Sequence, residues 1–448
     1  MTRYHARWIC PVSSPAIGNG TLVEEQGRIT FVGPRADAPP GDDDVDLGNV
    51  ILVPGLVNAH CHLELTAMRG FLDGLGFREW ILRLTFARRA VLTSDMLLDA
   101  ARLGVCEGLL HGVTTFADTG DTGAGFDAML ESGVRGICYR EVFGPDPLVA
   151  DEMMRGLIER VAEMQTRATD LVKVGVSPHA PYTVSDDLFR ATSKYARDNR
   201  LPMAVHIAES AAESDLVAEG AGAFAAGLRA RGIAVEPRAR TPIALLEKLG
   251  VLEANPLLIH CVRVDTEDIN AIRMYDCAVA HCPASNAKLG HGIAPLSAFL
   301  DAHIRVGIGT DSVASNDRMD MLDEARLAAL VANAHAGRHE ALMASNALEL
   351  ATLGGARALG IAHETGSLDV GKSADFAAFR IDRYRGPVHD PVAALIFALA
   401  GKRADVVAVA GTVLVRNRRL VNADEDLPAR VQETANRLQE WLAAEPLR

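Results

Sequence analysis

The sequence predicts an α/β protein in which eight parallel strands alternate with helices and close a (β/α)8 TIM-type barrel, with a small composite β-sandwich beside it. Three observations predict this fold class. Short apolar, β-branched runs alternate with helix-length segments through the middle of the chain, and such alternation builds parallel βα units. Both ends of the chain instead contain strand-like pieces broken by glycine and proline. The length of 448 residues suits a large barrel plus a smaller domain.

Eight apolar runs are predicted as the barrel strands. They cover residues 51–58, 114–117, 136–139, 172–177, 203–207, 257–261, 278–282 and 306–310. Helix-length segments such as 95–110 and 321–334 separate or follow them. An open, doubly wound sheet is the structural alternative, but no glycine-rich phosphate loop follows the first strand. The barrel is therefore the preferred prediction.

The two ends of the chain are predicted to meet. Residues 18–53 and 366–421 have the same broken, strand-like texture, and neither is large enough to bury its own core. We therefore expect them to pair into one β-sandwich. The predicted domains are 1–53 with 365–423 for the sandwich, 54–364 for the barrel, and 424–448 for a C-terminal helix. One face of that helix carries four aliphatic residues, which are Leu427, Val431, Leu438 and Leu442.

Composition and charge narrow the class of partner. The chain has 45 basic and 58 acidic residues, a formal net charge of −13, so it has no general attraction for nucleic acid or anionic membranes. Its 7 cysteines are scattered, which favours reduced thiols in the cytoplasm. There is no signal peptide pattern, and no apolar run approaches the roughly 18 residues needed to span a bilayer. We expect a cytoplasmic protein with a small-molecule substrate, and a homodimer is left open as the assembly.

Polar side chains suited to metal binding follow the predicted strands. Of 14 histidines, six lie at or just after strand ends. These are His60, His62, His179, His206, His260 and His281. Asp311 follows the eighth strand. The carboxyl ends of barrel strands form the active-site face, and core packing alone does not explain seven such groups there.

Four of these residues form a predicted metal site. His60 and His62 are two residues apart, so in a strand both imidazoles point to the same side. For this pair alone, two hydrogen-bonded core histidines are the alternative. His206 and Asp311 complete a set of three nitrogens and one oxygen, which suits zinc, iron or another divalent metal. A water bound to such a metal has a pKa of roughly 7 and provides hydroxide at neutral pH.

Six ordered motifs resemble the amidohydrolase superfamily, in particular its cytosine deaminases, adenosyl-type deaminases and triazine hydrolases. The motifs are PGLVNAHCH at 54–62, VHIAE at 205–209, IHC at 259–261, HCPASNAKLG at 281–290, GTDS at 309–312 and GSLDVGKSAD at 366–375. The resemblance covers nearly the whole chain. It implies a barrel with a composite sandwich and a metal-dependent amidohydrolase acting on C–N bonds of cyclic amidines, most commonly a deaminase.

The resemblance also implies a role for each matching residue. One metal ion would be held by His60, His62, His206 and Asp311. Glu209 would move a proton from the attacking water to the ring nitrogen or the leaving amine, with a solvated residue at a helix start as the alternative. His260 would hydrogen-bond the water or the tetrahedral oxygen. Asp311 would also accept a proton from the water.

Other positions are less specific. His179 resembles a substrate-contacting residue, with a strand-capping role as the alternative, and His281 would either line the pocket or support the metal ligands. Two-metal relatives usually need a carboxylated lysine or a glutamate late in the fourth strand. Lys173 lies at the start of that strand, roughly 15 Å from the active end. A single ion is therefore expected, zinc by preference, with iron, manganese or nickel as alternatives.

The segment after the first strand guides the substrate prediction. Methylthioadenosine and adenosylhomocysteine deaminases usually carry a Trp-Leu…Ile-Trp-Pro…Glu pattern there, which this chain lacks. HLELT at 62–66, followed by Phe77 and Trp80, resembles the aminodeoxyfutalosine deaminases of the alternative menaquinone pathway. Conversion of aminodeoxyfutalosine to futalosine and ammonia is thus the first expectation. The alternatives are deamination of S-adenosylhomocysteine or methylthioadenosine, hydrolysis of another heterocycle (guanine, cytosine or a triazine), and a non-catalytic assembly protein.

The benzoate of aminodeoxyfutalosine needs a cationic partner. Arginine pairs with a carboxylate in a bidentate fork, and Arg140, after the third strand, and Arg88 are the candidates. Ordinary surface arginines are the alternative for both. Trp80 could stack on an aromatic ring of the substrate, or it could be a buried helix tryptophan.

Overall fold

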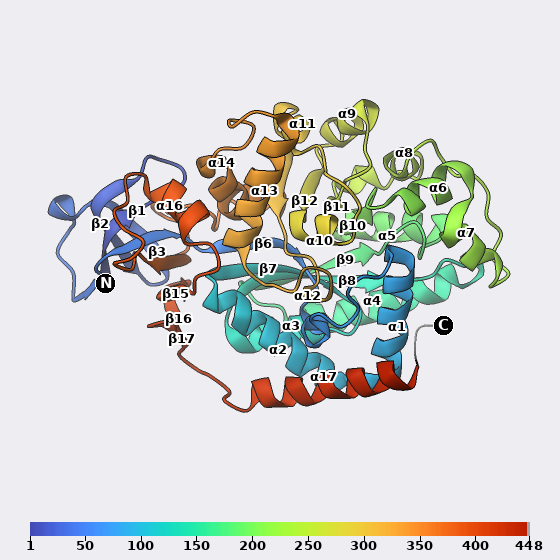
Figure 1. Ribbon diagram of the computed structural model, residues 1–448, viewed down its shortest axis with the longest axis horizontal. Helices are drawn as coiled ribbons and strands as arrows, with labels where there is room; N and C mark the ends of the chain where they lie inside the picture. Colours follow the sequence, from blue (N-terminus) through green and yellow to red (C-terminus); the bar gives the residue numbers. More distant parts are fainter. Residues whose placement is uncertain (446–448) are drawn as a thin grey trace.

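The computed structural model describes residues 1–445, and its centre is a closed barrel of eight parallel strands (Figure 1). In chain order the strands are β6 (Leu56–Cys61), β7 (Val113–Gly120), β8 (Arg135–Val142), β9 (Val172–Pro178), β10 (Ala204–Ile207), β11 (Leu257–His260), β12 (Ala278–His281) and β13 (Arg305–Ile308). They pair as two parallel four-stranded halves. Bridges between Val176 and Met203 and between Cys61 and Asp311 join the halves, so the predicted barrel is confirmed.

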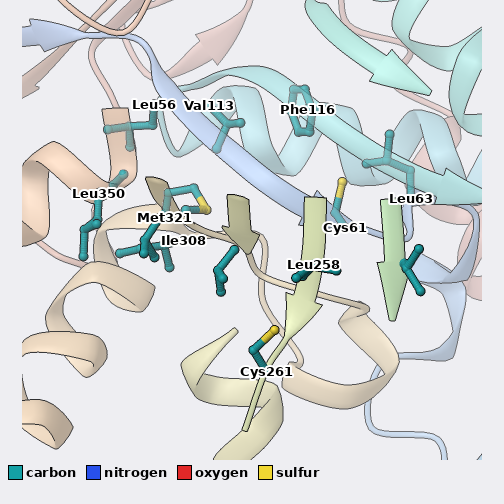
Figure 2. Packing of buried hydrophobic residues seen from close by; sticks show 14 of the residues in the cluster. Leu56, Cys61, Leu63, Val113, Phe116, Leu258, Cys261, Ile308, Met321 and Leu350 are labelled. Carbon is teal, nitrogen blue, oxygen red and sulfur yellow. The ribbon is translucent and has the colours of Figure 1, made fainter. Parts of the chain in front are cut away.

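Helices surround the barrel. Those between or after its strands include α2 (Ser94–Leu110), α3 (Ala124–Ser132), α4 (Ala150–Arg167), α5 (Asp186–Asn199), α6 (Ala211–Glu219), α7 (Gly222–Arg229), α8 (Pro242–Lys248), α9 (Thr266–Met274), α10 (Pro283–Lys288), α11 (Leu296–Asp301) and α13 (Met321–Ala336). Parallel strands are buried on both faces, so their sequences are continuously apolar. The outer faces of the strands pack against the helices; Leu56, Phe116, Leu258 and Ile308 belong to this cluster (Figure 2).

The predicted first strand, 51–58, is in fact two strands. β5 (Val50–Pro54) belongs to the accessory sheet, and β6 begins at Leu56. The chain changes sheets at Gly55, where a Cβ atom would lie 2.0 Å from Oγ1 of Thr114. Only glycine allows this close approach, and its N–H donates to the carbonyl of Asp375 (2.9 Å).

The two ends of the chain form one accessory sheet, which lies at one side of the barrel (Figure 1). Its strands are β1 (Thr2–Ile9), β2 (Ile17–Glu25), β3 (Arg28–Pro34), β4 (Asp43–Asp46), β5, β14 (Phe376–Arg380), β15 (Val406–Val409), β16 (Thr412–Arg416) and β17 (Arg419–Leu420). The join is the antiparallel pairing of β5 with β14, in which Ile51 faces Phe379. Tyr4, Leu22 and Phe376 are buried in the core of this sheet, and the predicted N- and C-terminal β-domain is thus present.

The C-terminal helix α17 (Leu427–Ala444) lies along the barrel below α2 and α1 (Phe77–Val91) (Figure 1). Leu427 and Val431 pack against Ala100 of α2, and Leu438 packs in a cluster with Trp80 of α1. Residues 446–448 of the predicted segment 424–448 lie outside the described residues. Among the helices of residues 1–445, none is long and apolar enough to cross a membrane.

Candidate active site

Four predicted ligands meet at the carboxyl end of the barrel. His60 lies in β6 next to its last residue, His62 follows β6, His206 lies in β10, and Asp311 follows β13. Oδ1 of Asp311 lies 3.3 Å from Nε2 of His60 and 3.4 Å from Nε2 of His62. The Nε2 atoms of His62 and His206 are 3.3 Å apart. Side chains from three segments that are far apart in sequence thus point at one small volume.

The donor set fits a divalent metal ion. Both ring nitrogens of His60 and Nδ1 of His206 are buried and have no hydrogen-bond partner within residues 1–445. Burial lowers the pKa of His62 to about 3 and the pKa of His206 well below its ordinary value. These rings are therefore neutral, which is the form that binds metal. His60, His62 and His206 form one group of possible metal ligands, and His60, His260 and Asp311 form a second group that shares His60 with the first.

Neighbouring groups orient the four side chains. Nδ1 of His62 is 2.9 Å from the carbonyl of Thr119, which leaves Nε2 free. Ser285 and Ser315 donate to Oδ2 of Asp311, so its Oδ1 is the atom that faces the histidines. Burial raises the pKa of Asp311, but the contact with His60 and nearby histidines outweighs it and holds that pKa well below its usual value.

Glu209 lies beside this cluster, just after β10. It is 4% exposed, and its Oε1 lies 3.1 Å from Nε2 of His291 and 3.6 Å from Nε2 of His260. Burial raises the pKa of Glu209, but these two histidines outweigh it and lower that pKa. The Glu213 carboxylate accepts hydrogen bonds from the N–H groups of Glu209 and Ala208 and fixes the turn. An ionised carboxylate next to a candidate cation site suits proton transfer.

Comparisons with known proteins agree with this geometry. Residues 51–414 match the model of the amidohydrolase family. The chain belongs to the amidohydrolase family. It is 33% identical to a 5-methylthioadenosine/S-adenosylhomocysteine deaminase of Moorella thermoacetica, over 94% of this chain and 96% of that protein. A protein of the same name from Halobacterium salinarum is 32% identical over 95% and 94% of the two chains.

Solved structures resemble this amidohydrolase over nearly its whole length. An adenosine deaminase from Xanthomonas campestris with bound zinc has a TM-score of 0.87 and 28% identity, and covers 98% of both chains. An atrazine chlorohydrolase from Arthrobacter aurescens complexed with zinc has a TM-score of 0.84 and 28% identity, over 98% and 100%. An aminofutalosine deaminase from Helicobacter pylori has a TM-score of 0.81 but 20% identity, over 93% and 100%, and shows the fold alone. The predicted enzyme class, an amidohydrolase of the deaminase type, is confirmed.

Two residues of the amidohydrolase site were missed from the sequence. His291 follows α10 rather than a barrel strand, so the strand-end pattern does not find it. Glu141 lies at the end of β8, where its Oε1 is 3.8 Å from Nδ1 of His206. The alternation of side chains along a strand could have predicted the position of Glu141. Residues two apart in a strand point to the same side, and Tyr139, two residues before Glu141, packs inside the barrel.

Two predicted substrate contacts lie at this mouth of the barrel. His179 is buried with its ring 4.7 Å from the ring of His206, and its Nδ1 is 2.7 Å from the Thr183 hydroxyl. His281 is also buried, and burial, aided by His260, lowers its pKa to about 4. Nδ1 of His281 has no hydrogen-bond partner in the part of the chain described.

The two predicted arginines differ in their surroundings. Arg88 of α1 forms ion pairs with Glu64 (2.6 Å) and with Asp121, so carboxylates of the chain already neutralise it. Arg140 of β8 is 4% exposed, and its buried Nε has no hydrogen-bond partner among residues 1–445. Burial lowers the pKa of Arg140.

The aromatic residues beside Glu209 and His291 are Phe77 and Tyr182, whose hydroxyl lies 3.5 Å from Oε2 of Glu209, rather than Trp80. Trp80 is 8% exposed and packs among aliphatic side chains that include Leu84 and Leu438. The Phe77 ring lies 4.6 Å from the His291 ring, edge to face. Phe77 is therefore closer to Glu209, through His291, than the predicted tryptophan.

Proposed function

We propose that the protein is a metal-dependent aminohydrolase that removes the 6-amino group of an adenine-type nucleoside, with 5′-methylthioadenosine and S-adenosylhomocysteine as the leading substrates. The observation that carries the chemistry is the buried Glu209 carboxylate, 3.6 Å from His260 and beside the cluster of three histidines and Asp311. The substrate class is supported by relatives with this name that match over more than nine-tenths of the chain.

The proposed residues divide the reaction between them. His60, His62, His206 and Asp311 would hold one ion, zinc by preference, which would supply a nucleophilic water at neutral pH. Glu209 accepts a proton from the attacking water and delivers it to the adjacent ring nitrogen. His260 hydrogen-bonds the oxygen that adds to the ring. Asp311 accepts the second proton and passes it to the leaving nitrogen, so the ring nitrogen and the leaving nitrogen each gain one proton and the products are a hypoxanthine nucleoside and ammonia.

Aminodeoxyfutalosine, the first expectation from the sequence, is the second candidate here. The segment 62–66 with Phe77 favours it, and Arg140, with its unpartnered Nε, is a candidate partner for a benzoate. The relatives described above are methylthioadenosine/adenosylhomocysteine deaminases by name. The aminodeoxyfutalosine candidate therefore rests on that sequence segment and on Arg140, and no relative described above supports it. A homodimeric assembly and a cytoplasmic location remain predictions.

Ammonia release from a substrate panel tests the proposal. The purified, zinc-loaded protein is assayed with methylthioadenosine, adenosylhomocysteine, aminodeoxyfutalosine, adenosine, guanine, cytosine and an aminotriazine. We expect the highest kcat/KM with an adenine nucleoside and loss of activity after chelation. Activity should return on adding zinc, and the activity recovered with zinc is compared with that recovered with iron, manganese or nickel. Preference for guanine, cytosine or the triazine would contradict the proposed substrate class, and full activity of metal-free protein would contradict the metal site.

A further inference from the structure

A pocket of about 470 Å³ opens beside the catalytic cluster. Phe77 and His291 line it, together with Ser210, the residue that follows Glu209. His291 connects the pocket to the proposed chemistry, because its Nε2 lies 3.1 Å from Oε1 of Glu209. The pocket therefore adjoins the site, and Phe77 and His291, whose ring centroids are 4.6 Å apart, line it on the side of Glu209.

The pocket is positively charged although the protein as a whole is acidic. Arg78 and Arg263 line it, and neither forms an ion pair within residues 1–445. Its one acidic lining residue, Glu79, lies 3.4 Å from Arg83 of the same helix. Arg88, in contrast, is neutralised by carboxylates. The net charge of −13 means that the protein as a whole does not attract anions. Two guanidinium groups without carboxylate partners in one pocket create a local positive potential there.

Two helix starts add to this potential. α1 begins at Phe77 without a side-chain cap, and α6 begins at Ala211 after Ser210. Both starts line the pocket, and the N-terminus of a helix carries partial positive charge. On α7, a Cβ at Gly227 would lie 3.0 Å from Nη2 of Arg78, so this guanidinium rests against α7 and is only half-exposed.

We propose that this pocket receives the 5′ substituent of the nucleoside, and that Arg78 and Arg263 bind an anionic group on it. The inference rests on the proposed function. Chemistry at the adenine ring places that ring beside Glu209, so the remainder of the substrate must extend into adjoining open space. A planar guanidinium pairs with a carboxylate through two parallel hydrogen bonds. The protein therefore selects adenosine derivatives whose 5′ end is acidic over the uncharged methylthioadenosine.

Four nucleosides distinguish the possible anions. Adenosylhomocysteine carries an amino acid carboxylate, aminodeoxyfutalosine a benzoate, and adenosine 5′-monophosphate a phosphate, whereas methylthioadenosine carries no charge there. The zinc-loaded enzyme and the Arg78→Gln/Arg263→Gln double variant are assayed with all four. We expect kcat/KM for a carboxylate substrate, relative to methylthioadenosine, to fall about tenfold or more in the double variant. A preference for the monophosphate, lost in the same variant, would identify phosphate as the anion.

Control variants locate the effect. Arg89 is exposed on the same helix as Arg78 and outside the pocket, so Arg89→Gln should leave the substrate ratio unchanged. Zinc content and the thermal midpoint of the double variant should match the wild type. An unchanged ratio in the double variant, an equal loss for all substrates, or a loss of selectivity in Arg140→Gln instead would overturn the proposal.

Binding separates failure of the pocket from failure of the proposed function. Glu209→Gln is used as a background for calorimetric titration with adenosylhomocysteine and methylthioadenosine, because binding is then measured without turnover. We expect adenosylhomocysteine to bind more tightly than methylthioadenosine, and this difference to disappear in the Arg78→Gln/Arg263→Gln double variant. That result supports the pocket even if the wild-type enzyme deaminates neither nucleoside. In that case only the proposed function fails. Equal affinity for the two nucleosides in the Glu209→Gln background would overturn the pocket assignment.

Discussion

Replacing Glu209 by glutamine separates proton transfer from metal binding. The side chain is 4% exposed and close to His260 and His291, so an amide of the same size fits the space but cannot accept the proton. General acid–base catalysis contributes about 10²–10⁴ in rate. Turnover should therefore fall by about two to four orders of magnitude, equivalent to about 3–5 kcal/mol of transition-state stabilisation.

The assay measures kcat for ammonia release together with zinc content. Because Glu209 is not one of the four proposed ligands, Glu209→Gln should keep one zinc per chain. Glu219 is exposed at the end of α6, the helix that follows Glu209, and Glu219→Gln is the matched control with expected wild-type activity. Near-normal turnover in Glu209→Gln would refute the proton-transfer role, and loss of zinc would instead indicate that Glu209 is a ligand.

Three further substitutions test other parts of the structure. Glu141→Gln removes the carboxylate 3.8 Å from Nδ1 of His206 and should weaken zinc binding about 10–100-fold in a chelator competition; unchanged affinity would count against this orienting role. Asp375→Asn breaks the buried pair with Arg135, whose Nε lies 2.7 Å from Oδ2, and should lower the free energy of unfolding by about 3–5 kcal/mol in urea. An effect under about 1 kcal/mol would refute that estimate. Leu438→Ala, at a site 1% exposed, should cost about 2–5 kcal/mol, and an unchanged urea midpoint would show that α17 does not stabilise the barrel.

The fold could be predicted because its physical signals are local. Buried parallel strands are apolar along their whole length, so runs such as 278–282 and 306–310 stand out, and they correspond to β12 and β13. The change of sheet at Gly55 was not predicted. It depends on a close approach to Thr114, 59 positions later in the chain, and no local pattern reports such an approach.

The predicted ligands could be found for the same reason. The carboxyl ends of the strands meet at one edge of the barrel, so His206 and Asp311 were brought together by topology alone. His291 was not predicted because it lies in a loop after the short helix α10, and it reaches Glu209 from that loop rather than from a strand end. The position of a loop residue depends on tertiary packing, which strand-end reasoning does not include.

Charged side chains show most clearly what the sequence alone leaves open. Arg88 and Arg78 lie ten positions apart on one helix, yet Glu64 and Asp121 neutralise the first, while the second forms no ion pair within residues 1–445. The difference arises from segments that α1 meets only in the folded protein. A guanidinium that already contacts two carboxylates attracts a substrate anion only weakly. The two carboxylates repel the anion, or the anion must displace one of them. Residue type and helix therefore do not determine which arginine binds substrate. Arg78 and Arg263 line a pocket beside Glu209 and have no carboxylate partner among residues 1–445, which is why we propose that these two arginines, rather than Arg88, bind the substrate anion.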